Sequence, residues 1–358
     1  MIVNMANEFA RREHKISLIV LHQDGPYRDR VSPAVEIVSL DKDRAGKAFF
    51  ALRNCLLERQ PEIVVSALFH VNVLLLLVRL SLWRKRPKII VTERNHFSMR
   101  VKYSDRFIDK LFPPLVFLLY RFADKVVGIS RGVADDIRKV ARLPETRADW
   151  IHNPVVAPAT LEALKETAAD PWFEQGDEPV IVTSGRLVPQ KDYDTLFRAM
   201  AELLKRRKAR LLILGTGPLQ EQLETLAQDL NIRDHIHFAG FVENPLAYMK
   251  RAQLFVMSSH WEGFCNVIVE ALLCGLPVVA TDCPSGPAEI LDGGKYGTLV
   301  PVGGYEALAA AMAKALDAPH DPERQIRRAM DFTVEKICDQ YEKLAESMPV
   351  SSKRSEDG

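Results

Sequence analysis

The chain has few cysteines and no long apolar run. Its five cysteines are scattered through 358 residues and never spaced as Cys-x-x-Cys, which argues against a disulfide scaffold or a zinc cage. The longest uncharged run, residues 63–78, has 16 residues including polar ones, whereas a membrane span needs about 20 apolar residues. Lys and Arg number 48 against 47 Asp and Glu, and 47% of residues are hydrophobic, which excludes a disordered chain. We expect a globular, cytoplasmic protein.

Positive charge is concentrated in the first half of the chain. Residues 1–155 hold 27 Lys and Arg against 17 Asp and Glu, a net charge of +10, whereas the remainder has a net charge of −9. Residues 79–110 alone carry ten basic residues against three acidic ones. With the apolar stretches 73–78 and 111–120, this segment is expected to bind an anionic membrane surface, on the cytoplasmic face of the inner membrane. The alternative is that these apolar residues face the core and the cations form a solvated surface.

Short apolar, β-branched runs alternate with helical stretches along the whole chain, as is typical of buried parallel strands. This pattern predicts an α/β protein with two Rossmann-like, doubly wound domains, residues 1–155 and 156–330, that meet near Pro154. A polar tail, residues 349–358, is expected to be disordered. The predicted strands are 16–21, 35–40, 63–68, 88–92 and 126–129, then 180–183, 211–214, 236–238, 254–257, 278–280 and 298–300.

A loop with two cations, Arg186 and Lys191, follows the strand at 180–183. The loop ends where a helix is expected to begin, with Asp192 or Asp194 as its N-cap. An arginine fork, a lysine point charge and free N–H groups at a helix N-terminus together suit a diphosphate. The alternative is two solvated cations beside a turn.

Two further strand-to-helix junctions carry glycines or carboxylates. Gly215 and Gly217 permit a tight turn before Pro218, the expected first helical residue, and either contact a nucleotide or form an ordinary turn. Glu262 and Glu270 are eight residues apart, so both can line one helix face and accept hydrogen bonds from sugar and ribose hydroxyls. The alternative is an exposed glutamate near each of two helix turns.

Residues 262–282, together with Ser184-Gly-Arg-Leu and Lys191, resemble glycosyltransferase family 4. Members are retaining enzymes of the GT-B fold, in which two Rossmann-like domains face a cleft. The resemblance implies that the first domain binds the acceptor, the second binds the nucleotide sugar, and a C-terminal helix, residues 331–348, crosses back to the first domain. Residues 285–291 and 92–95 further resemble the branch that builds bacterial surface polysaccharides and lipid-linked oligosaccharides.

The resemblance also implies roles for single residues. Arg186 and Lys191 would hold the donor diphosphate, Glu270 the ribose and Glu262 the transferred sugar. A residue after the strand at 88–92 would contact that sugar, with Arg94 and His96 as the two candidates. The expected donor-binding residues are Gly185, Gly215, Gly217, Gly263, Phe264, Cys265, Asn266 and Glu270, the four at 263–266 chiefly through backbone N–H groups, although Cys265 stands where glycine or proline is more usual.

One departure from the family concerns the first domain. The family's first strand and glycine-rich loop should precede the helix that resembles residues 2–12, yet this chain begins inside that helix. We therefore expect the first strand of the N-terminal domain to be missing, with an apolar slot left in its sheet.

The expected reaction is metal-independent transfer of a hexose or N-acetylhexosamine, with retention, from a UDP-sugar to a lipid-linked or polysaccharide acceptor, without a cofactor. By the same resemblance, the leaving diphosphate takes the acceptor's proton. Asp192-Tyr-Asp194 has the Asp-x-Asp spacing of metal-dependent transferases, but helix capping is favoured. The alternatives are a small soluble acceptor or an NAD-type oxidoreductase, although no strand is followed by Gly-x-Gly-x-x-Gly. The charge pattern does not favour nucleic acid.

Overall fold

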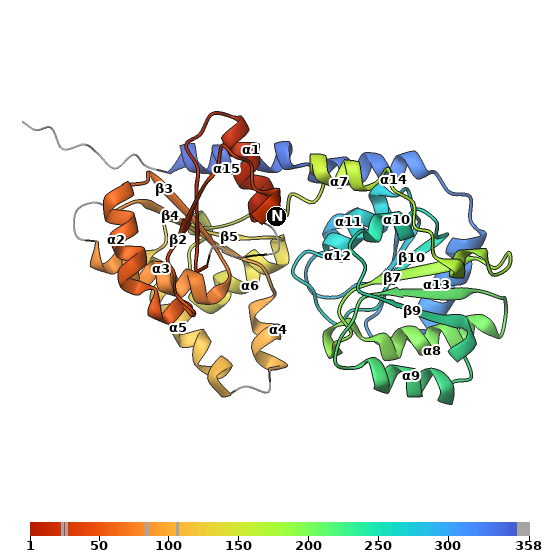
Figure 1. Ribbon diagram of the computed structural model, residues 1–358. Helices are drawn as coiled ribbons and strands as arrows, with labels where there is room; N and C mark the ends of the chain where they lie inside the picture. The colour runs from red at the N-terminus through yellow and green to blue at the C-terminus, as the bar shows by residue number, and fades with distance from the viewer. Residues whose placement is uncertain (23–24, 26–27, 83–85, 105–106, 349–358) are drawn as a thin grey trace, which may run out of the picture.

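The computed structural model describes residues 1–22, 25, 28–82, 86–104 and 107–348. They form two α/β domains side by side, joined at residues 151–157 (Figure 1). No helix in these ranges is long and apolar enough to cross a bilayer. The predicted tail, residues 349–358, lies outside the described residues.

The N-terminal domain contains two parallel sheets. Strands β3, β4, β5 and β6 pair in that order, and β1 pairs with β2 in a separate sheet. The elements are α1 (Ile2–Arg11), β1 (Ser17–Val20), β2 (Glu36–Ser39), α2 (Phe49–Arg59), β3 (Ile63–Ala67), α3 (Phe69–Ser81), β4 (Lys88–Glu93), α4 (Phe97–Lys102), α5 (Phe112–Leu119), β5 (Lys125–Gly128), α6 (Arg131–Ala141) and β6 (Ala148–Trp150).

The described strands of the N-terminal domain fall into two separate sheets, with β1 and β2 apart from the other four. Among the described residues, no strand pairs with the second edge of β1 or of β3. Val65 of β3 is 40% exposed, whereas Val91 of β4 and Val127 of β5 are fully buried. The outer edge of β3 is therefore less covered than an interior strand of a doubly wound sheet.

The C-terminal domain is built on one parallel sheet of six strands, in the order β12-β11-β10-β7-β8-β9. Apolar side chains fill both of its faces, as in other doubly wound folds. The elements are α7 (Pro158–Ala163), β7 (Val180–Ser184), α8 (Tyr193–Leu204), β8 (Arg210–Leu214), α9 (Gln220–Asp229), β9 (Ile236–Gly240), α10 (Pro245–Met249), β10 (Leu254–Met257), α11 (Asn266–Leu273), β11 (Val278–Thr281), α12 (Pro287–Ile290), β12 (Thr298–Val300), α13 (Tyr305–Asp317) and α14 (Pro322–Ala329).

The last helix, α15 (Val334–Ser347), lies beside α1 on the N-terminal domain (Figure 1). Ile337 and Tyr341 are buried in one apolar cluster with Ile90 of β4. Arg12, at the end of α1, pairs with Asp339 and Glu342 at 2.7 Å each. The C-terminal segment is therefore part of the N-terminal domain's core.

The predicted strands are confirmed within two residues at each end, because each is a short, mostly apolar run. The three-residue strand β6 was not predicted, since Ala-Asp-Trp carries no such run. The expectation that Pro218 begins a helix is wrong: α9 begins at Gln220, and Gly217 and Pro218 belong to the preceding turn.

Candidate functional site

The candidate site lies where the strand order of the C-terminal sheet reverses. From β7 the chain moves to β8 on one side, whereas β10 lies on the other side. In open parallel sheets, ligands bind beyond the carboxyl ends of the strands at such a point. The loops that follow β7 and β10 carry Lys191 and Glu262, and they meet there in an ion pair of 2.6 Å between Lys191 Nζ and Glu262 Oε1.

The Lys191–Glu262 pair is largely shielded from water. Glu262 is 7% exposed, and its Oε1 also accepts a hydrogen bond from Ser259 Oγ at 2.8 Å. Burial alone would lower the pKa of Lys191, but the adjacent Glu262 carboxylate outweighs it and holds this pKa above its ordinary value. The structure thus joins in one charged unit the residues predicted to hold the diphosphate and the sugar.

Arg186 remains available for a ligand. Its side chain is exposed, and it forms no hydrogen bond or ion pair with any described residue. The neighbouring Gly185 lies against Lys191, because a Cβ at Gly185 would be 3.1 Å from Lys191 Cε. An exposed, unpaired guanidinium in the same loop as a half-buried lysine is an arrangement that can bind an anion.

Gly215 and Gly217 pack the turn after β8 against the loop after β7. A Cβ at Gly215, whose φ is +144°, would lie 2.1 Å from the carbonyl oxygen of Gly185, and one at Gly217 would lie 2.4 Å from that of Leu187. The backbone requires glycine at both positions. This packing fixes the Arg186 loop, and a direct contact with the donor stays a prediction.

The turn at residues 263–266 presents backbone rather than side chains. Phe264 and Cys265 are buried, and Cys265 Sγ lies 2.8 Å from Met257 Sδ in the core. Cys265 has a φ of +73° and precedes the first residue of α11. Among the described residues, no acceptor is found for the N–H groups of Gly263 to Asn266. Any donor contact by Phe264 and Cys265 must therefore be made by the backbone, as the sequence predicted.

Glu270 is a carboxylate without a partner. It lies on α11, half-buried, and no described residue forms a hydrogen bond or ion pair with its side chain. Burial raises its pKa to about 7. The expectation that Glu262 and Glu270 share a helix face is wrong, because α11 begins only at Asn266 and Glu262 lies in the loop before it.

Arg94 and His96, the two candidates after β4, occupy different places. The guanidinium of Arg94 contacts Met1 Sδ at 2.8 Å and Asn153 Oδ1 at 3.5 Å, and burial lowers the pKa of Arg94. His96 instead caps α4, with its Nδ1 lying 3.2 Å from Asp136 Oδ2. The backbone of Arg94 packs against the predicted donor turn, because a Cβ at Gly263 would be 2.2 Å from the Arg94 carbonyl oxygen.

Two polar residues that sequence analysis missed connect the domains at this turn. Ser130 Oγ donates to the carbonyl oxygen of Gly263 at 2.7 Å, and Asn153 Nδ2 donates to Asn266 Oδ1 at 2.8 Å. Ser130 and Asn153 are both buried. Ser130 comes two residues after β5 and directly after the strand predicted at 126–129, so its place after a parallel strand is a usable signal, whereas the sequence indicates for Asn153 only a place in a linker.

The two carboxylates of the Asp-x-Asp sequence stabilise the start of α8. Asp192 caps this helix by accepting from the N–H of Thr195, and Asp194 pairs with Arg198 at 2.6 Å. The predicted capping role is confirmed. Both carboxylates thus already have partners within the C-terminal domain.

The basic segment 79–110 is only partly a charged surface. Arg84, Lys85 and Arg106 lie outside the described residues. Arg79 pairs with Asp124, Lys88 donates to the carbonyl oxygen of Met348, and Arg94 is half-buried as above. The four described cations that are exposed are Arg86, Arg100, Lys102 and Lys110.

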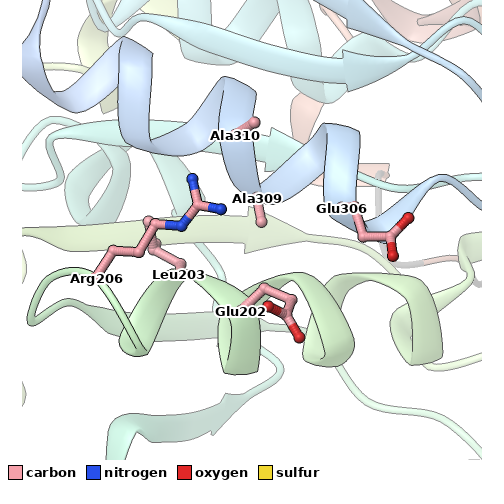
Figure 2. Close-up of a pocket in the computed structure, with 6 residues that line it drawn as sticks. All are labelled: Glu202, Leu203, Arg206, Glu306, Ala309 and Ala310. Carbon is pink, nitrogen blue, oxygen red and sulfur yellow. The ribbon is translucent and has the colours of Figure 1, made fainter.

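A separate hollow between α8 and α13 does not belong to this site. Figure 2 shows it between Glu202, Arg206 and Glu306, with alanine side chains at its wall. Its volume is only about 50 Å³, and none of the predicted site residues lines it.

Comparison with known proteins identifies the family. Residues 1–157 match the model described as Glycosyltransferase Family 4, and residues 165–332 match the model described as Glycosyl transferases group 1. The chain belongs to glycosyltransferase family 4. The predicted family and the GT-B arrangement of two α/β domains are therefore confirmed.

Two relatives of this glycosyltransferase are named for lipopolysaccharide core biosynthesis and for transfer to an undecaprenol-linked sugar. It is 33% identical over 235 residues to the lipopolysaccharide core biosynthesis glycosyltransferase LpsE of Rhizobium meliloti, over 64% of this chain and 66% of that one. It is 30% identical over 204 residues to the N-acetylgalactosamine-N,N'-diacetylbacillosaminyl-diphospho-undecaprenol 4-alpha-N-acetylgalactosaminyltransferase of Campylobacter jejuni, over 57% of this chain and 53% of that one. Both alignments thus leave a third or more of the relative unmatched.

The fold of this glycosyltransferase is shared by Anabaena HepE, solved in complex with UDP. The TM-score is 0.75 at 18% identity, over 97% of this chain and 95% of that one. At this identity the likeness establishes the fold alone.

Proposed function

We propose that this glycosyltransferase transfers a hexose or N-acetylhexosamine from a nucleotide sugar, with UDP as the expected nucleotide, to a lipid-linked or polysaccharide acceptor in cell-surface glycan biosynthesis. The observation that carries the proposal is the Lys191–Glu262 pair at the sheet's switch point, beside the exposed and unpaired Arg186. The names of the Rhizobium and Campylobacter relatives support the acceptor class, and the HepE complex supports UDP.

In the proposed reaction, the anomeric configuration is retained and the charge that develops on the leaving diphosphate is stabilised electrostatically. Arg186 and Lys191 would bind that charge, and one such donor is worth about 3 kcal/mol in the transition state. The free backbone N–H groups at residues 263–266 would also stabilise the negative charge on the diphosphate. The leaving phosphate oxygen would accept the acceptor hydroxyl's proton.

We also propose that neither a metal ion nor a cofactor takes part. The Asp192 and Asp194 carboxylates, which have the spacing of a metal-binding pair, are already engaged in helix capping and in the pair with Arg198. Positive charge for the diphosphate would come instead from the Arg186 loop. Turnover unchanged by a chelator, with the donor that proves active, is the expected result, and loss of turnover that Mg²⁺ or Mn²⁺ restores would contradict it.

The decisive experiment is a panel of nucleotide sugars with detection of the released nucleotide, combined with titration of UDP and of NADH. We expect UDP to bind and NADH not to bind. Because Arg186 is exposed, Arg186→Ala should fold normally, yet it should weaken UDP binding about tenfold or more through loss of a charge-assisted contact. The matched control is Arg206→Ala, which removes an exposed arginine of the same domain at the hollow of Figure 2. Equal UDP affinity in both variants would refute the site.

The outer face of α5 is the proposed membrane-docking surface. Leu111, Leu115 and Leu118 are 48%, 37% and 53% exposed, at a spacing that places them on one side of the helix (α5 is at the lower edge of the N-terminal domain in Figure 1). Lys110 is exposed at the start of this segment, and Arg100 lies 5.9 Å from the Phe112 ring. Exposed leucines flanked by cations suit an anionic lipid surface. Val116 and Leu119 on the opposite side are buried, so the core alternative holds for part of the stretch.

Co-sedimentation with liposomes tests this docking. Binding to anionic vesicles is expected to weaken with rising salt and to be lost in Leu115→Glu/Leu118→Glu. The control, Leu161→Glu, changes a leucine of similar exposure (40%) on α7. Equal recovery in the supernatant with anionic and neutral vesicles would instead favour a small soluble acceptor.

A further inference from the structure

A carboxylate of the C-terminal domain binds the end of a helix in the N-terminal domain. Glu289, on α12, accepts hydrogen bonds from the backbone N–H groups of Arg131 and Gly132, at 2.8 and 3.0 Å. These are the first two residues of α6. The same carboxylate lies 3.1 Å from His152 Nε2. A helix N-terminus is partially positive and has unpaired N–H groups, so it binds a carboxylate well.

Electrostatic effects agree with this geometry. Burial alone would raise the pKa of Glu289, but the hydrogen bonds from His152 and from the two backbone N–H groups outweigh it, and the pKa lies below its ordinary value. The carboxylate is therefore ionised at neutral pH, the state in which it binds the N-terminus of α6 most strongly.

Glu289 is itself held firmly within its own domain. Arg328 donates to the carbonyl oxygens of Glu289 and Ile290, at 2.7 and 2.8 Å. On the other side, a Cβ at Gly286 would lie 2.4 Å from the carbonyl oxygen of Phe264, so the turn before α12 packs against the donor turn. A displacement of Glu289 would therefore also displace the segment that carries Glu262.

The helix that Glu289 binds also contacts the donor turn directly. Ser130, the N-cap of α6, donates to the carbonyl oxygen of Gly263 at 2.7 Å. The approach leaves no spare room, because a Cβ at Gly132 would lie 2.5 Å from Ser285 Oγ. His152 completes the junction by stacking on Phe264, with ring centroids 4.9 Å apart.

We propose that Glu289 is a positioning residue, which clamps α6 of the N-terminal domain onto the turn that carries Glu262 and Gly263. The clamp sets the distance between the two domains at the place where the acceptor must approach the donor sugar. It is a charged contact placed outside the predicted donor site, so it acts on the alignment of the two substrates and not on nucleotide affinity. Its link to turnover rests on the proposed function, whereas its effect on domain contact does not.

Hydrogen exchange of the full chain, followed by mass spectrometry, tests the clamp independently of activity. In Glu289→Ala, exchange should rise both at residues 130–134 and across the interface at residues 260–262, where the N–H groups of His260 and Glu262 are hydrogen-bonded to the carbonyl oxygens of Gln190 and Pro284. If Glu289 were only a helix cap, the rise would be confined to residues 130–134, and the proposal would be overturned. Glu221→Ala, an exposed glutamate on α9, is the control and should change neither segment.

A second variant guards against misfolding of the first. Glu289→Gln keeps one oxygen that can accept from α6 but loses the charge and the second acceptor, so it should show the same pattern at smaller amplitude. With a donor that proves active, Glu289→Ala should lower kcat about tenfold, which is the effect expected from losing hydrogen bonds to a charged group. The KM for the donor should stay within about twofold. An unchanged kcat, or an equal loss of UDP affinity, would contradict a positioning role. If no donor is turned over even by the unaltered protein, the proposed function fails, yet the exchange pattern still decides the clamp.

Discussion

Among single residues, Glu270 bears an unfavourable charge that the fold does not compensate. Its pKa rises from an ordinary value of 4.5 to about 7 because of burial. Between these values the native state holds a proton that the unfolded chain has released, so the free energy of unfolding falls as pH rises from about 4.5 to 7. Relative to the unaltered protein, Glu270→Gln should therefore raise the free energy of unfolding by about 2 kcal/mol more at pH 8 than at pH 5. Urea unfolding of both proteins at both pH values measures this difference.

The same variant separates stability from function. An uncharged amide accepts hydrogen bonds from ribose hydroxyls less strongly than a carboxylate does, so Glu270→Gln should bind UDP more weakly at pH 8 even though it is more stable. Glu224→Gln, on α9, is a control for the loss of one carboxylate. A stability gain that is the same at pH 5 and pH 8 would show that Glu270 titrates normally.

The Lys191–Glu262 pair predicts a different result, because both charges compensate each other. Lys191→Ala leaves Glu262 buried beside no cation, which should cost about 3 kcal/mol of unfolding free energy. Adding Glu262→Gln removes the uncompensated charge, so the double variant should be more stable than Lys191→Ala alone. A double-mutant cycle by urea unfolding measures this coupling, and strictly additive effects would argue against the ion pair.

At the scale of elements, Ser130 makes two hydrogen bonds at the start of α6. Ser130 accepts from the N–H of Val133 at the helix start and donates to Gly263. Ser130→Ala should cost about 2 kcal/mol, since it removes a cap and leaves a buried carbonyl oxygen unpaired. Asp321→Ala removes the cap of α14 and a 3.7 Å ion pair with Arg327, both at an exposed site, and should cost about 1 kcal/mol, since an exposed ion pair adds little. Similar losses in the two variants, by thermal unfolding, would mean that the contact with Gly263 adds nothing.

The elements also show how far the sequence alone could go. Strands such as β7 and β10 are predicted almost to the residue because each is a short, mostly apolar run that is buried on both faces. The loops after them were singled out for the same reason, as positions that follow parallel strands. The pairing of Lys191 with Glu262 could not be read in this way, since 71 residues separate them and no local pattern encodes which loops meet. Phe264 and Cys265 illustrate the converse, because the sequence could not tell that their side chains face the core.

For the whole molecule, the contacts between the domains are what sequence analysis largely missed. Ser130, Asn153 and Glu289 each bind a partner more than 100 residues away in the other domain. In the sequence, Glu289 stands out only as part of the segment 285–291 that resembles the family, and its partner groups are backbone N–H groups, which no side-chain pattern reveals. The relative placement of two domains therefore depends on complementary surfaces that only the structure shows.

An aromatic stack offers a direct measure of this placement. Tyr103 of the N-terminal domain lies on Trp261 of the C-terminal domain, with ring centroids 4.5 Å apart and planes within 10° of parallel. Trp261 is only 9% exposed, whereas Tyr103 is 52% exposed. Tyr103→Ala should therefore uncover Trp261 while leaving both domains folded, since such a pair contributes only about 1 kcal/mol.

The expected readout is tryptophan fluorescence of the full chain. Uncovering Trp261 should move the emission to longer wavelength and increase quenching by acrylamide, and the same change made in a Trp261→Phe background should have no effect. If Tyr103→Ala leaves the emission unchanged in the unaltered background, Trp261 is already in contact with water and the two rings do not stack in solution as they do in the structure. Because Trp261 precedes Glu262 directly, the same signal would then report on whether nucleotide binding restores the stack beside the candidate site.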